Sequence, residues 1–164
     1  MSTATETSPL VEQAKRHTGM VKDRLLKTFS FVPDDKLTWS PAPTCKCALR
    51  IVAHCGNSNA AFIRIMKGIP FPATSPEEMM EMARAADEAI TTREEAIALI
   101  ESSTAEVLVT IDNLTPAQVD SMIETPMFTA PMAFWMNLPA RHMDNHASQI
   151  DMLQTCWGDM DWHM

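Results

Sequence analysis

The sequence contains five histidines, and two of them have a spacing that suits metal ligation. His142 and His146 are four residues apart, so on an α-helix both side chains lie on one face, with Cβ atoms ~6 Å apart. Two imidazoles in this arrangement can reach a single metal ion at ~2.0–2.1 Å. The spacing alone is weak evidence, because such a pair also arises by chance.

A count around the helix adds a third histidine. At about 100° per residue, His142 and His146 fall in the middle of an apolar stripe, which also holds Trp135, Leu138, Gln149 and Leu153. His54 has the same setting on another segment, between Ile51 and Ala61. Burying three imidazoles without partners is costly. We therefore predict that His54, His142 and His146 are the ligands of one divalent metal ion. Hydrogen-bonded core histidines are the alternative.

The histidine pair does not form a zincin motif. Met143 occupies the position at which H-E-x-x-H carries its general base, and Asp144 is about 200° around the helix from His142. This argues against a zincin-type peptidase. Of the other histidines, His17 lies at the border of an apolar face and is expected to be partly exposed. His163 adjoins the carboxy terminus and is expected to be mobile.

Polar residues near the ligand faces are candidates for supporting roles. Gln149, Asn57 and Ser58 are placed to hydrogen-bond to bound water or to the second nitrogen of an imidazole. Cys55 follows His54 directly and points about 100° away from it, so it is expected to pack rather than to ligate. No nucleophile has a convincing base beside it in the sequence, so no catalytic residue is assigned.

Helices must position these side chains. Apolar spacing and capping signals predict five of them, at about 9–31, 44–67, 76–89, 93–113 and 132–156. The first is capped by Thr7 or Ser8, the second begins at a Thr44 cap, and Pro139 should kink the last or begin it. The connection over 114–131 contains three prolines and is expected to be irregular, with at most one helical turn.

Composition limits the classes of function. A length of 164 residues predicts one domain over 1–164. The net charge of −8 argues against nucleic acid as a partner. The amino terminus does not resemble a signal peptide, and no apolar run is long enough for a membrane span, so a cytoplasmic location is expected. There the four cysteines should be reduced, namely Cys45, Cys47, Cys55 and Cys156.

Several stretches resemble the DinB/YfiT-like superfamily of metal-dependent enzymes. The segment from Pro33 to Pro41 is similar to its loop after the first helix, and Ile51-Val52-Ala53-His54 to its first histidine motif. The segment from His142 to Ile150 is similar to its H-x-x-x-H-R-G-Q motif, with Ala147 and Ser148 in place of Arg-Gly. The resemblance covers nearly the whole chain.

This resemblance implies an all-α fold, an up-down-down-up four-helix bundle with a short extra helix in the crossover between helices two and three. It also implies a three-histidine site for zinc, nickel or a similar ion, often in a homodimer. Relatives in the superfamily include bacillithiol-dependent transferases and isomerases that depend on mycothiol or glutathione. A low-molecular-weight thiol is therefore a further expected cofactor.

Two functions stay open at this point. One is a metal-dependent S-transferase or hydrolase that acts on a small molecule, because three neutral imidazoles leave an open coordination position at the metal. Zinc in such a setting lowers the pKa of bound water to about 7, or holds a thiolate. The other is a non-catalytic helical protein that binds a ligand or partner and in which the metal is structural.

Overall fold

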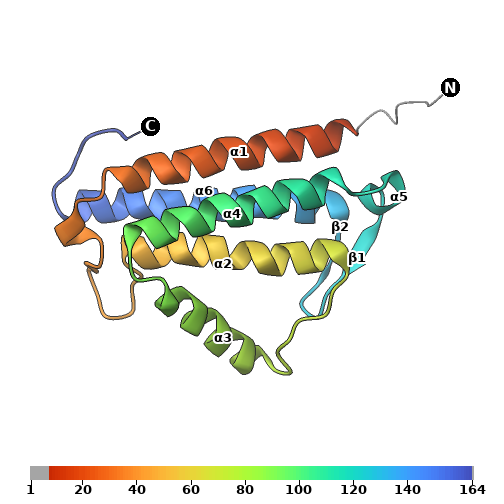
Figure 1. The fold of residues 1–164 in the computed structure, drawn as a ribbon, viewed down its shortest axis with the longest axis horizontal. Coiled ribbons are helices and arrows are strands. Elements are labelled where there is room, and N and C mark those ends of the chain that lie inside the picture. Colours follow the sequence, from red (N-terminus) through yellow and green to blue (C-terminus); the bar gives the residue numbers. More distant parts are fainter. Residues whose placement is uncertain (1–7, 164) are drawn as a thin grey trace.

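Four long helices form an up-down-down-up bundle in the computed structural model, which describes residues 8–163 (Figure 1). They are α1 (Pro9–Ser30), α2 (Ala48–Lys67), α4 (Arg93–Asp112) and α6 (Met132–Cys156). Helix α2 packs against α4 and α6, and α1 packs against the same two helices on the other side. The predicted all-α bundle is confirmed. The amino-terminal residues 1–7, which carried the expectation about a signal peptide and the Thr7 cap, lie outside the described residues.

Helix α2 begins later than the sequence predicted. Its N-cap is Cys47, not Thr44, and it ends at Gly68, which adopts a left-handed conformation with φ 65°. The carbonyl of Cys47 accepts the first helical hydrogen bond from Ile51 N–H. The N–H of Leu49 donates to the carbonyl of Leu37 in the preceding loop. This hydrogen bond between the loop and the first turn sets where the helix starts.

The crossover between α2 and α4 holds α3 (Pro76–Ala89), as predicted. Ser75 caps α3 by accepting a hydrogen bond from the N–H of Glu78, and Thr92 with Glu95 forms a complete capping box at the start of α4. Figure 1 shows α3 slanting away from α2 toward its amino-terminal end. Among the long helices, α3 packs mainly on α2.

The connection between α4 and α6 is more ordered than the sequence suggested. The one helical turn is α5 (Pro116–Val119), and it is followed by β1 (Met122–Glu124) and β2 (Thr129–Pro131). The strands pair antiparallel, with Ile123 opposite Ala130. Each strand has three residues, which is too short for an alternating pattern to be recognised in the sequence.

Helix α6 runs without interruption through Pro139, so the alternative of a helix that begins there is wrong. The side chain of Asn137 donates to the carbonyl of Ala133 within this stretch. The buried face of α6 includes Met136, Ala140, Met143, Ala147 and Ile150, all at 0% exposure. In residues 8–163, no helix is both long and apolar enough to cross a membrane.

Candidate metal centre

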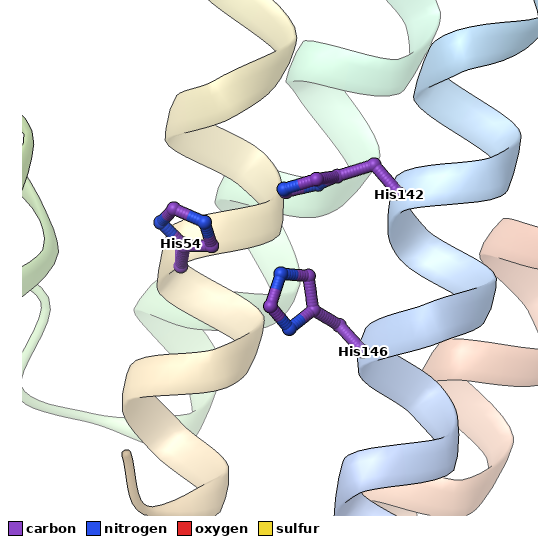
Figure 2. A group of neighbouring side chains, drawn as sticks. All are labelled: His54, His142 and His146. Atoms are coloured by element: carbon purple, nitrogen blue, oxygen red, sulfur yellow. The ribbon is translucent and has the colours of Figure 1, made fainter. Parts of the chain in front are cut away.

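Three histidines converge between α2 and α6. His54 extends from α2, and His142 and His146 extend from successive turns of α6 toward it (Figure 2). One ligand atom from each side chain lies within 4.8 Å of the others. The ring centroid of His54 lies 5.1 Å from that of His142 and 5.0 Å from that of His146. The spacing of one helical turn therefore brings two imidazoles of α6 to a third on α2.

The histidines lie beside the buried faces of their helices rather than in the middle of them. Met143 and Ala147 on α6 and Cys55 on α2 are fully buried, whereas the three histidines are half-buried. The sequence analysis placed His142 and His146 in the middle of the buried face of α6. That prediction was wrong by about one residue, because Met143 and Ala147 occupy the middle. This position suits a reactive site, because imidazoles at the edge of the core can meet one another and still be reached from outside.

Hydrogen bonds orient two of the three imidazoles. Nδ1 of His54 lies 3.1 Å from Oδ2 of Asp87, and Nδ1 of His146 donates to Oε1 of Gln149 at 2.7 Å. In the described part of the chain, neither ring makes a hydrogen bond through Nε2. Within residues 8–163, Nδ1 of His142 is buried and has no hydrogen-bond partner. Its ring packs edge to face against Phe62, with centroids 5.3 Å apart.

The electrostatics favour neutral imidazoles. Burial, reinforced by the neighbouring His146 and His54, lowers the pKa of His142 to about 3. Burial also lowers the pKa of His146. At neutral pH these two rings are unprotonated, which is the form that binds a metal ion. Three imidazole donors, among them a buried nitrogen of His142 with no hydrogen-bond partner in residues 8–163, fit a divalent cation such as zinc or nickel.

Asp87 is a part of the site that the sequence did not reveal. It extends from α3, is 3% exposed, and contacts His54, as well as Asn57 at 3.0 Å and Lys46 at 3.3 Å. Burial alone would raise the pKa of this carboxyl, but the hydrogen bonds from His54 and Asn57 outweigh it and hold the pKa below its usual value. No sequence signal distinguishes Asp87 from the other acidic residues of α3.

The predicted supporting residues have different outcomes. Gln149 bonds to a histidine nitrogen, as expected, but Asn57 donates to Asp87 rather than to an imidazole. Ser58 is half-buried and makes no hydrogen bond to the three histidines in the described chain. Cys55 packs in the core as predicted, and burial raises the pKa of its thiol. Met143, in the position of the zincin base, is likewise core.

The remaining histidines stand apart from the site. His17 is exposed on α1. His163 stacks on Phe31 at 4.2 Å between ring centroids and bonds to Asp159 at 2.8 Å; its expected mobility stays a prediction. Asp144 is half-buried and paired with Arg24, so it does not face the three histidines as a base.

A cleft of about 460 Å³ reaches the site from the side of α3. Its lining comes from α3, from α2 and from the loop before α2, and consists of Lys46, His54, Met80, Glu81, Ala83, Arg84 and Asp87. The cleft thus touches His54 and Asp87 of the site, and its lining residues do not include the other two histidines. It combines apolar side chains with charges of both signs, a mixture suited to a small polar molecule.

Comparison with known proteins agrees with the helical bundle. The family model of the DinB superfamily matches residues 18–150. This chain belongs to the DinB superfamily.

Two solved structures share the fold. The crystal structure of a mycothiol-dependent maleylpyruvate isomerase aligns with a TM-score of 0.71 at 17% sequence identity, and covers 92% of this chain and 63% of its own. A variant of that isomerase, with one histidine replaced by alanine, aligns with a TM-score of 0.71 at 16% identity and the same coverage. This chain therefore spans less than two thirds of those structures. No curated protein sequence matches it significantly.

Proposed function

We propose that this chain is a metal-dependent enzyme that acts on a small molecule, with a divalent cation, zinc or nickel, held by His54, His142 and His146. The observation that carries the proposal is the convergence of one ligand atom from each of the three imidazoles within 4.8 Å. When bound, such a cation supplies Lewis acidity, which lowers the pKa of a thiol or water at the remaining coordination position.

The residues of the chain prepare this position. Burial keeps His142 and His146 unprotonated, so their lone pairs are available at neutral pH. Gln149 and Asp87 orient two of the rings through their Nδ1 atoms. Three protein ligands leave at least one position for a group from outside the protein.

We further propose that this outside group is a low-molecular-weight thiol and that the reaction is thiol-dependent transfer or isomerisation. The solved isomerase of the same fold is mycothiol-dependent, and this supports a thiol as the outside group here. The thiol of Cys55, which follows His54 in the sequence, is fully buried and stays protonated, so it is a poor nucleophile. Hydrolysis by water at the same position is the alternative reaction.

The test compares metal-free and metal-loaded protein in the presence of mycothiol, bacillithiol or glutathione. Loss of free thiol to an electrophilic aryl halide and isomerisation of maleylpyruvate are both measured, with His142→Ala as the control. Turnover that needs both the metal and a thiol, and that the variant lacks, supports the proposal. Metal-dependent hydrolysis without thiol favours the hydrolase. Bound metal that raises the melting temperature without any turnover favours the structural role.

A further inference from the structure

Helix α3 meets the bundle through one buried side chain, and that side chain contacts the candidate metal centre. Asp87 is buried, while every other residue of α3 is exposed. Its two carboxylate oxygens contact α2 and the preceding loop, through His54 and Asn57 on the helix and Lys46 before it. The guanidinium of Arg50 donates a hydrogen bond to the backbone carbonyl of Asp87.

A carboxylate is an unusual choice for the docking residue of a solvated helix. Burying a charge is unfavourable unless it is paired and hydrogen-bonded, and an alanine or leucine would dock α3 without that penalty. The partners of Asp87 include a member of the histidine triad at 3.1 Å. The residue type is therefore explained by its contact with His54 better than by packing.

This contact decides which nitrogen of His54 is free. An ionised carboxylate accepts hydrogen bonds and donates none. Nδ1 of His54 must therefore carry the proton that bridges to Asp87, and Nε2 keeps a lone pair. Carboxylates that bond to the second nitrogen of a ligating histidine fix the tautomer and the ring orientation, and they make the imidazole a stronger donor to the metal.

We propose that Asp87 is a positioning residue of the metal centre, which holds His54 with the proton on Nδ1 and couples binding of the cation to docking of α3 on α2. The coupling rests on the proposed metal site. A cation at Nε2 draws electron density from the ring, so Nδ1–H becomes a stronger donor to Asp87 and α3 is held more firmly. Since coupling between two events is reciprocal, docking of α3 in turn raises the affinity for the cation.

The consequence reaches the cleft beside the centre. Met80, Ala83 and Arg84 of α3 form one wall, opposite Lys46 and His54. Because Asp87 is the one buried side chain of α3, the same hydrogen bond that orients His54 also fixes this wall. Binding of the cation therefore shapes the cleft in which a small molecule would lie.

The first experiment measures zinc affinity by competition with a chromophoric chelator. Asp87→Asn is expected to bind zinc about 10- to 100-fold more weakly than the unaltered protein. Asp151→Asn is the matched control, since it removes a carboxylate that joins α6 to α1 through Arg24 and Thr28. Its zinc affinity should be unchanged. Equal affinity in the Asp87 variant and the unaltered protein would overturn the proposal.

The second experiment measures amide hydrogen exchange across α3 with and without zinc. Zinc should slow exchange in α3 in the unaltered protein but not in Asp87→Asn. Equal exchange with and without zinc in the unaltered protein would overturn the coupling. If Asp87→Asn does not fold, Asp87→Glu takes its place. The Glu variant is expected to keep at least part of the zinc affinity and of the zinc-dependent slowing of exchange in α3.

The third measurement needs neither a variant nor a metal. Nitrogen-15 shifts of the His54 ring in the metal-free protein should show a protonated Nδ1 and an unprotonated Nε2. The opposite tautomer would overturn the positioning role, even if zinc binds. Absence of both zinc and nickel binding in the unaltered protein would instead overturn the proposed function and the coupling, while the tautomer still tests the contact with Asp87.

Discussion

The metal-free protein should lose stability on mild acidification because of His142. Burial lowers the pKa of its imidazole to about 3 in the folded state, against about 6.5 in the unfolded chain. As the pH falls below 6.5, the unfolded chain takes up a proton that the folded protein does not. The free energy of unfolding therefore falls with pH until the folded pKa is reached. Between pH 7 and pH 5 the loss from this one group is about 2 kcal/mol.

That magnitude requires only that the folded pKa of His142 is well below 5. The assay is urea denaturation at pH 7 and pH 5 with a chelator present, on the unaltered protein and on His142→Gln. Other groups titrate in both proteins, so the difference between their pH dependences isolates this imidazole. The pH-dependent loss should be about 2 kcal/mol smaller in the variant. Equal losses in the two proteins would refute the claim that burial keeps His142 neutral.

Three further results are expected. Gly19→Ala should stabilise the protein by about 1 kcal/mol in urea denaturation, because nothing lies within 4 Å of the added Cβ and alanine favours the helix. Gly56→Ala should instead destabilise the protein by about 1 kcal/mol, because the added Cβ would lie 2.6 Å from Cγ of Leu99 and the overpacking outweighs the gain in helix propensity. Stabilisation equal to that of Gly19→Ala would show that α2 and α4 are not in close contact there. Zinc at 100 times its dissociation constant should raise the free energy of unfolding by about 2.7 kcal/mol in the unaltered protein but not in His142→Ala, as measured by thermal denaturation; equal shifts would place the zinc elsewhere.

The helices and the pairing of His142 with His146 on one helical face could be predicted because their signals are local. Capping at Ser75 and Thr92, the stop at Gly68 and the spacing of His142 and His146 depend on residues within a few positions of one another. The centre of the buried stripe on α6 was less well defined. Methionines and alanines form a second apolar face beside the histidines, and a helical count alone does not decide which one faces the core.

The contact between Asp87 and His54 could not be predicted, because it joins residues 33 positions apart on two helices. Their meeting depends on the path of the loop between α2 and α3 and on the angle at which α3 lies against α2. Locally, Asp87 is one of several acidic residues on an exposed helix. The hairpin of β1 and β2 was missed for a different reason, since its strands of three residues contain no usable periodicity.

Metal analysis of the purified protein tests the central claim most directly. The unaltered chain is compared with a triple variant, His54→Ala with His142→Ala and His146→Ala, and with His17→Ala as a control histidine that is exposed on α1. The account predicts about one zinc or nickel ion per chain in the unaltered protein and in the control, and none in the triple variant. Equal metal content in the triple variant and the unaltered protein would contradict it.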